Sequence, residues 1–390
     1  MAPRIVSVGT AVPATRVTQE QVRELFAAQP GADRLAQRRI RAAFDAAAIE
    51  TRHTVIAELG GGVPGGAGPR FLGPDGVLRM PTTGARNAAY VELAPPLYAE
   101  AAKAAMTDAS ADASAVTHVV TVSCTGFFAP GPDYRLVRDL GLPPTVERYH
   151  LGFIGCAAAL PALRLAARIC TAQPDAVVLV VCAELCSLHL TTSTDPQQIV
   201  AASVFADGAA AAIVTAVDDI GDGGGLVLEE FATALTSEGE DDMVWRIGDH
   251  GFEMVLSAEV PRIIGREIRG AVDRFLAGSP APDAWAVHPG GRSVLDRVEA
   301  GLELDPSSLA ASRAVLRDYG NMSSATVLFI LRELLRDNEA VGDGATVAGL
   351  AFGPGLTVES AIMTRRMPRT ADVDLDVEDF AAVAAPGVSA

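Results

Sequence analysis

The feature that most constrains the fold of this 390-residue chain is one order of strands and helices that occurs twice. The first half contains an apolar strand at 117–123, a helix at 157–170, and strands at 176–182 and 209–214. The second half contains a strand at 284–288, a helix at 323–336, and strands at 346–351 and 357–363. Strands that alternate with helices predict an α/β fold. The repeated order indicates an internal duplication.

The chain is too long for one ordinary hydrophobic core, so we expect two halves. We place them at 1–217 and 226–366, joined by a linker at 218–225 that is rich in Gly and Asp. Residues 367–390 form an acidic tail with five acids and no base after 370, which predicts partial disorder. Further expected elements are a strand at 4–9, helical spacing at 18–45 with Thr18 as N-cap, a surface loop at 60–76 and a helix at 94–109.

The charge and the cysteines exclude several classes of function. A net charge of -17 disfavours nucleic acid and anionic membranes as partners, so a small-molecule partner is expected. The five cysteines form no C-x-x-C pair, which predicts reduced thiols and no zinc or redox site. The N-terminus lacks a secretory signal pattern, and the apolar run at 176–183 is too short to span a bilayer. We therefore expect a soluble, cytoplasmic protein.

Cys156 is the candidate nucleophile. It follows a short apolar stretch at 151–154 and directly precedes the helix at 157–170. The positive end of a helix macrodipole and its unpaired N–H groups favour a thiolate at this position. The small residues at 157–159 leave room for an acyl group. The same pattern also fits a buried, inert cysteine, because free cysteines are among the most buried residues.

Two further residues complete a Cys/His/Asn set. His288 ends an apolar strand and opens the turn His288-Pro289-Gly290-Gly291, at the sheet edge where α/β proteins bind ligands. Asn321 precedes a strongly amphipathic helix. A structural histidine and a helix N-cap are the alternative interpretations of these two. Together with Cys156, the side chains are of the types that hold a thioester and stabilise an enolate or oxyanion.

Around these residues the sequence closely resembles type III polyketide synthases, the chalcone-synthase-like branch of the thiolase superfamily. The matching motifs run in family order from about residue 5 to 363. They are Val122-Ser123-Cys124-Thr125-Gly126 with Pro130-Gly131, Gly155-Cys156, His288-Pro289-Gly290-Gly291 with Tyr319-Gly320-Asn321-Met322-Ser323-Ser324, and Phe352-Gly353-Pro354-Gly355-Leu356-Thr357. The resemblance implies a duplicated, five-layered αβαβα thiolase-like fold and a homodimer, which agrees with the internal duplication.

The resemblance also implies a reaction. Cys156 would accept an acyl group from an acyl-CoA starter, and His288 and Asn321 would bind the thioester carbonyl of malonyl-CoA during its decarboxylation. The enolate would attack the acyl group on Cys156, and the cycle would repeat before cyclisation to a pyrone or resorcinol-type product. An imidazolium at His288 would first pair with the thiolate and lower its pKa. Neither a metal nor a redox cofactor is expected, because loss of carbon dioxide drives the condensation and coenzyme A arrives with the substrate.

The resemblance further suggests which residues bind substrate. Phe205 and Phe252 fall on gatekeeper positions between the CoA tunnel and the reaction cavity, and Cys124, Cys186 and His189 fall on pocket-lining positions. Gly353 and Pro354 belong to the closing glycine-rich motif. Ala46 stands where plant relatives often carry a CoA-contacting lysine, so we assign CoA binding to Arg38 or Arg41 instead. The segment at 242–252 is similar to microbial alkylpyrone and alkylresorcinol synthases, which accept fatty acyl starters.

Three other functions are compatible with parts of the pattern. A ketoacyl synthase III type enzyme would use the same trio for a single condensation with a malonyl group bound to a carrier protein, but the motifs at 321–324 and 352–355 favour the polyketide synthase. An inactive scaffold is disfavoured because all three chemical positions are filled. A Cys/His/Asn hydrolase lacks the expected sequence context around Cys156.

Overall fold

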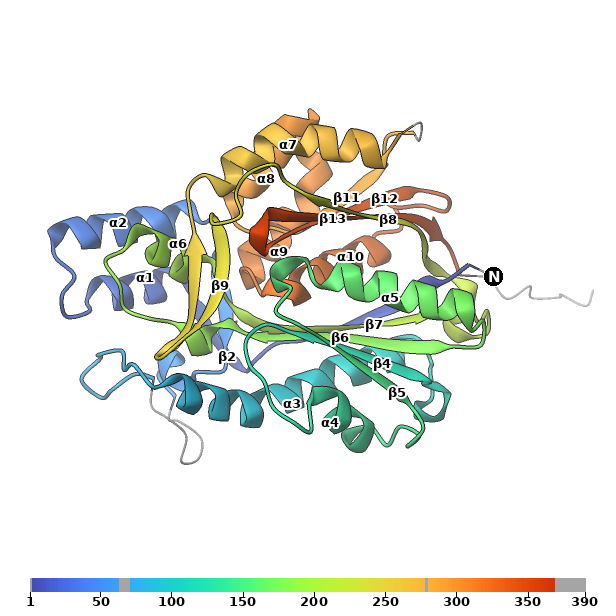
Figure 1. Cartoon of the computed structure of the whole chain (residues 1–390), viewed down its shortest axis with the longest axis horizontal. Helices are drawn as coiled ribbons and strands as arrows, with labels where there is room; N and C mark the ends of the chain where they lie inside the picture. The colour runs from blue at the N-terminus through green and yellow to red at the C-terminus, as the bar shows by residue number, and fades with distance from the viewer. Residues whose placement is uncertain (1, 63–70, 278–279, 369–390) are drawn as a thin grey trace, which may run out of the picture.

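The computed structural model describes residues 2–62, 71–277 and 280–368. Five layers alternate between helices and sheet strands, as Figure 1 shows, so the predicted αβαβα architecture is confirmed. The outer helices on one side are α3 (Thr83–Asp108) and α4 (Pro132–Asp139), and those on the other side are α7 (Val260–Phe275) and α8 (Arg292–Leu302). The middle layer contains α5 (Ala159–Ala172), α9 (Ala310–Tyr319) and α10 (Thr326–Arg336).

The strands form one nine-stranded sheet with the order β11-β12-β13-β8-β1-β7-β6-β4-β5. The N-terminal part contains β1 (Arg4–Ala11), β4 (His118–Ser123), β5 (Glu147–Gly152), β6 (Val177–Leu185) and β7 (Asp207–Thr215). The C-terminal part contains β8 (Gly225–Leu235), β11 (Ala284–Val287), β12 (Thr346–Gly353) and β13 (Thr357–Arg366). Only two residue pairs, Arg4 with Val227 and Ile5 with Leu226, join β1 to β8. The two parts therefore remain separate layers above and below the middle helices (Figure 1).

The pairing of the strands confirms the internal duplication. In the first half β4 is parallel to β6, and β6 is antiparallel to β7. In the second half β11 is parallel to β12, and β12 is antiparallel to β13. The helix that precedes the second strand of each set, α5 or α10, lies in the middle layer. Because both faces of these strands are covered by helices, their sequences are almost continuously apolar.

The remaining elements surround the end of the molecule at which the site lies. They are β2 (Thr15–Thr18), α1 (Gln19–Ala27), α2 (Arg34–Ala46), β3 (Thr51–Thr54), α6 (Pro196–Val204), and the hairpin of β9 (Met243–Gly248) and β10 (Gly251–Leu256). Thr18 caps α1 in a complete capping box with Gln21, as the sequence indicates. The helical spacing at 18–45 is interrupted, because Asp33 caps a second helix, α2.

Some predicted boundaries are wrong. The helix predicted at 94–109 begins at Thr83, because Thr82 caps it and the helix accommodates Pro95 and Pro96 in its interior. The linker at 218–225 contains a short 3-10 turn before β8. Residues 63–70 of the predicted loop at 60–76, and residues 369–390 of the acidic tail, lie outside the described residues. The division into halves at 217 and 226 stays a prediction.

One segment, residues 155–172, is long and apolar enough to cross a membrane by length and composition alone. It contains α5, which lies between the two sheet layers, and its apolar residues belong to the hydrophobic core. A helix packed on both sides by sheet is expected to be apolar all round. We interpret this segment as a core helix.

Candidate active site

Cys156 lies in a short 3-10 turn, Gly155–Ala157, directly before α5. Between the end of β5 and Cys156 two residues have a positive φ, namely Phe153 at 59° and Gly155 at 75°. A positive φ is strained for phenylalanine, and such strain occurs mainly where the surrounding structure enforces it. The sharp turn places the thiol at the N-terminal end of α5, as the sequence predicts.

The closing glycine-rich motif packs against this turn. A Cβ atom at Gly155 would lie 2.4 Å from Cδ of Pro354, and a Cβ atom at Gly353 would lie 2.9 Å from the carbonyl oxygen of Ile154. Only glycine fits at either position without displacement. Gly353 and Pro354 therefore hold the cysteine turn in place, and Pro354 also lines a cavity beside Cys156.

His288 directly follows β11, where its N–H donates to the carbonyl of Leu350 at 2.8 Å. The side chain is fully buried, yet neither ring nitrogen has a hydrogen-bond partner among the described residues. An unpaired buried polar group is costly and is rare in native structures. Because the imidazole lines a cavity, this arrangement is typical of a group that hydrogen-bonds to a ligand.

The amide of Asn321 is oriented by its neighbours. Its Oδ1 accepts a hydrogen bond from the N–H of Ser323 at 2.8 Å, so the N-capping role is realised in part. Its backbone N–H donates to Val204, and its carbonyl accepts from Ala206, each at 2.9 Å. With the oxygen occupied, the amide nitrogen is the donor available to the cavity; it lies 3.4 Å from the carbonyl oxygen of Gly290, a long hydrogen bond.

The structure brings the three predicted chemical residues together. Cys156, His288 and Asn321 all line one large outer cavity with a volume of about 760 Å³. Cys156 precedes α5 in the first half, whereas His288 follows β11 and Asn321 precedes α10 in the second half. The site therefore lies where the duplicated halves meet. The strand and helix ends converge there because the two sheets and their middle helices run to a common edge.

Burial keeps each of the two titratable groups neutral when taken alone. It raises the pKa of the Cys156 thiol to about 11, although hydrogen bonds from Ser323 and Asn321 oppose the rise. It lowers the pKa of His288 to about 3. A thiolate and an imidazolium offset part of this cost when they form together, since each favours the charged form of the other. The ion pair between them stays a prediction.

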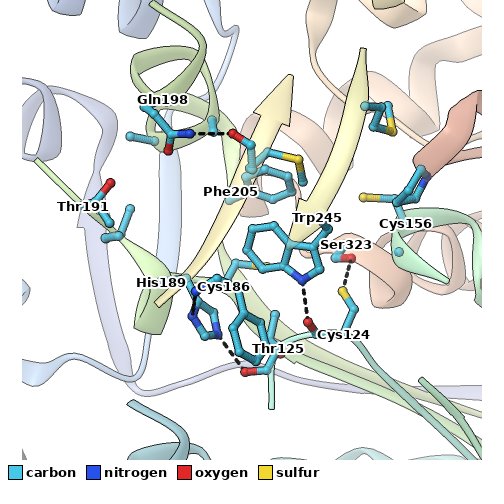
Figure 2. A pocket seen from close by; sticks show the side chains of 18 residues that line it. Cys124, Thr125, Cys156, Cys186, His189, Thr191, Gln198, Phe205, Trp245 and Ser323 are labelled. Atoms are coloured by element: carbon cyan, nitrogen blue, oxygen red, sulfur yellow. Dashed lines mark hydrogen bonds between the residues drawn. The ribbon is translucent and has the colours of Figure 1, made fainter. Parts of the chain in front are cut away.

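A second, inner cavity of about 50 Å³ lies on the other side of Cys156. The predicted pocket residues Cys124, Cys186 and His189 all line it. Figure 2 shows the indole of Trp245 in the middle of this space, between Cys156 and His189. The indole Nε1 donates to the carbonyl of Cys124 at 2.7 Å, which fixes the ring across the cavity.

Cys156 and Phe205 line both cavities, so Phe205 lies at their junction, as predicted for a gatekeeper. Phe252 does not: it lines the inner cavity alone. Met254, two residues further along β10, lines both cavities together with Met243. Met243 and Met254 therefore lie at the junction with Phe205. The gatekeeper role of Phe252 stays a prediction.

His189 and Phe252 form a rigid wall of the inner cavity. Their rings stack at 4.2 Å with an interplanar angle of 12°. The His189 Nδ1 accepts from the N–H of Phe252 at 2.9 Å, and its Nε2 donates to the carbonyl of Thr125 at 2.8 Å. Burial lowers the pKa of His189 to about 4. With both nitrogens engaged, this histidine shapes the cavity as a neutral ring.

Sequence reasoning missed Glu184. This carboxylate is fully buried at the end of β6, and burial raises its pKa. It accepts hydrogen bonds from Thr125 at 2.8 Å, from the backbone of Cys124 at 3.0 Å and from Ser324 at 2.6 Å. It thereby ties the Cys124 turn to the Asn321 turn. An acid inside the apolar run at 177–185 is the signal that indicates such a residue.

The residues predicted to bind coenzyme A do not line the outer cavity. Neither Arg38 nor Arg41 is among the described residues that line it. Arg41 instead pairs with Glu24 of α1 at 3.2 Å. Helix α2 presents Ala43, Ala46 and Ala47 to the cavity.

Comparison with known proteins matches both halves. Residues 2–218 match the family described as "Chalcone and stilbene synthases, N-terminal domain", and residues 229–367 match the corresponding C-terminal domain. The chain belongs to the chalcone and stilbene synthase family. Its members include the type III polyketide synthases, so this chain is a condensing acyltransferase that adopts the thiolase-like fold.

Relatives within this family are named for different products. The chain is 34% identical to bisdemethoxycurcumin synthase of Oryza sativa subsp. japonica over 92% of this chain and 91% of the relative. It is 33% identical to the alpha-pyrone synthesis polyketide synthase-like protein Pks18 of Mycobacterium tuberculosis over 70% of this chain and 71% of the relative.

Solved structures of polyketide synthases share the fold. The PKS-I structure from the brown alga Ectocarpus siliculosus has a TM-score of 0.86 and 29% identity, covering 93% of this chain and 98% of that one. The 1,3,6,8-tetrahydroxynaphthalene synthase of Streptomyces coelicolor A3(2) has a TM-score of 0.81 and 29% identity, covering 93% and 99%. The predicted family is thus confirmed, whereas the substrates are not specified by it.

Proposed function

We propose that this chain condenses malonyl-CoA repeatedly onto a short acyl-CoA starter and cyclises the product to a pyrone or resorcinol-type ring. The observation that carries the proposal is the position of Cys156 at the junction of two cavities. The outer cavity, with a volume of about 760 Å³, is also lined by His288 and Asn321. The inner cavity offers space for the growing chain.

Each residue has a chemical role in this proposal. The Cys156 thiolate attacks the starter thioester, and coenzyme A leaves. The imidazole of His288 and the amide of Asn321 donate hydrogen bonds to the thioester oxygen of malonyl-CoA as carbon dioxide departs, which stabilises the enolate. The enolate carbon then attacks the acyl group on Cys156 and releases the thiolate. The proposal includes neither a metal nor a redox cofactor.

The size of the inner cavity supports a short starter. The inner cavity has a volume of about 50 Å³, whereas one water molecule requires about 10–15 Å³ measured in the same way, so the free space holds only a few waters. In this proposal Trp245 and the stacked His189 and Phe252 rings limit the length of the starter. The proposal therefore favours a shorter starter than the fatty acyl groups accepted by the synthases that residues 242–252 resemble.

Purified protein tests this proposal with malonyl-CoA and acyl-CoA starters of increasing length. We expect release of carbon dioxide and a cyclic product with short starters, and at least a 100-fold loss of product in Cys156→Ala, because no other thiol lies at the junction. Cys170→Ala is the matched control, since this thiol is buried in the core, where it contacts the carbonyl of Val214.

Two outcomes would contradict the proposal. Retained product formation in Cys156→Ala would reject the nucleophile. A single-condensation product found only with malonyl groups on a carrier protein would favour the ketoacyl synthase III type of reaction.

A further inference from the structure

The outer cavity has a basic wall that the reaction chemistry does not use. Among the described residues lining this cavity, the basic ones are Arg262 of α7 and Arg292 and Arg297 of α8. All three side chains are exposed to the solvent-filled space. The opposite wall, α2, contributes alanines. An anionic ligand that extends outward from His288 therefore meets positive charge on one side only.

The charges on this wall are only partly neutralised. Arg262 pairs with Glu259, and Arg292 pairs with Asp296 at 3.3 Å. Asp296 is also paired with Arg313 at 2.9 Å, so it is shared between two cations. Arg297 forms no ion pair with a carboxylate among the described residues. The wall thus carries net positive charge in a chain whose total charge is -17.

The position of Arg297 is shaped by its neighbour on α7. A Cβ atom at Gly265 would lie 3.2 Å from Cδ of Arg297. Glycine inside a helix costs about 0.5–1 kcal/mol relative to alanine, so a glycine here needs a local reason. The absent side chain leaves a path along which the stem of Arg297 crosses α7 beside Arg262.

The start of α8 adds donors to the same wall. Its N-cap is Gly291, which supplies no side-chain cap, and Gly290, Gly291, Arg292 and Ser293 all line the cavity. The first N–H groups of a helix have no intrahelical partner and favour anions. Arg297 lies five residues further along the axis than Arg292, which is about 7.5 Å. The wall therefore offers positive charge from the depth of the cavity towards its mouth.

We propose that Arg262, Arg292 and Arg297 bind the phosphate groups of the coenzyme A thioesters. This inference rests on the proposed function, since it names the part of the substrate that the α7–α8 wall holds. Arginine forks bind phosphate oxygens through two parallel hydrogen bonds. A strongly acidic protein repels coenzyme A at long range, so a local basic wall is needed to hold it. The assignment replaces Arg38 and Arg41 of α2.

The test compares each substrate as its coenzyme A thioester and as its N-acetylcysteamine thioester, which lacks phosphates. We measure kcat/KM for both forms and take their ratio, which cancels effects on folding and on the chemical step. In Arg297→Ala we expect the preference for the CoA form to fall about tenfold. Arg262→Ala and Arg292→Ala should lower it less, because both arginines are partly neutralised by carboxylates.

Three controls use arginines outside the cavity. Arg269→Ala removes a cation from α7 that pairs with Glu303 at 2.9 Å, and it should leave the ratio unchanged. Arg38→Ala and Arg41→Ala should also leave it unchanged. A fall of the ratio in the α2 variants, with none in the α7 and α8 variants, would overturn the proposal.

Titration calorimetry with coenzyme A itself separates this proposal from the proposed reaction. Wild-type protein should bind coenzyme A about tenfold more tightly than Arg297→Ala, even if no product forms from any thioester. Equal affinity in the two proteins, or no binding to the wild type, would reject the basic wall whatever the outcome for the reaction.

Discussion

At the residue scale, the site is built from groups whose neighbours restrict what they do. Asn321 uses its oxygen on the backbone of Ser323, so it faces the cavity as a donor. His189 uses both ring nitrogens on backbone groups and therefore does not act as a base. His288 uses neither ring nitrogen. Of the two histidines near Cys156, His288 is the one available for proton transfer.

Alkylation of Cys156 tests the link between the thiol and His288. We expect iodoacetamide to inactivate the wild type near neutral pH, because the imidazole accepts the thiol proton. In His288→Ala the pKa of the Cys156 thiol is set by burial and hydrogen bonds alone, and burial raises it to about 11. The inactivation rate of this variant should therefore rise only at a pH several units higher. Identical pH profiles for the two proteins would show that His288 does not activate Cys156.

At the element scale, function depends on turns that meet from distant parts of the chain. The cysteine turn is pressed against the turn after β12. Phe205, directly after α6, forms a β-bridge with Asn321. Arg52 of β3 donates hydrogen bonds to the carbonyl oxygens of Ala202 and Phe205, each at 2.8 Å. These backbone contacts hold Phe205 at the cavity junction.

Gly155→Ala tests the contact between two of these turns. Alanine at position 155 would have to adopt a positive φ, which costs about 1–2 kcal/mol. Its Cβ atom would also clash with Pro354, at a further cost of about 1–3 kcal/mol. We expect a clearly lower Tm and loss of activity. Gly141→Ala is the matched control, because Gly141 has a φ of 65° but nothing within 4 Å of the added atom. The variant Gly155→Ala with Pro354→Ala should recover part of the Tm; no recovery would argue against the clash.

The β9–β10 hairpin determines the room available to the growing chain. Trp245→Ala removes the indole that crosses the inner cavity, so we expect longer starters to be accepted and products with more extensions. Mass spectrometry of the products measures this. Ile247→Ala, on the same strand but 61% exposed, should leave the products unchanged. An unaltered product range in Trp245→Ala would show that another group limits chain length.

At the scale of the whole molecule, burial shifts the pKa of several interior groups in the direction that favours their neutral form. Burial lowers the pKa of His288 to about 3 and that of His189 to about 4, and raises that of Asp207 to about 6. Stability from the histidines is fully present above pH 6.5, their ordinary pKa, and is lost as the pH falls. Stability from Asp207 has the opposite sign: it is present at low pH and is lost as the pH rises through 6.

The pKa shifts of the two histidines and Asp207 together predict that the protein is less stable in mild acid. Between pH 6.5 and 5, protonation of each histidine in the unfolded chain lowers the stability by up to about 2 kcal/mol, whereas Asp207 raises it by at most about 1 kcal/mol. We expect the Tm to fall between pH 7.5 and 5.0, and to fall less in His288→Asn, which has no imidazole to protonate. An equal fall in both proteins would show that other groups control the acid response. The homodimer stays a prediction, and a sedimentation measurement would test it.

The sequence by itself determined the α/β class, the duplication and the family, because apolar strands, glycine-rich turns and motif order are local properties of the chain. It also predicted Cys156, His288 and Asn321, since each lies in a distinctive turn. Only the tertiary structure decided that Met243 and Met254 lie at the junction with Phe205, that Glu184 ties two turns together and that α7 and α8 supply the basic wall. These features depend on which side chains meet across elements distant in sequence, and local patterns carry no information about such contacts.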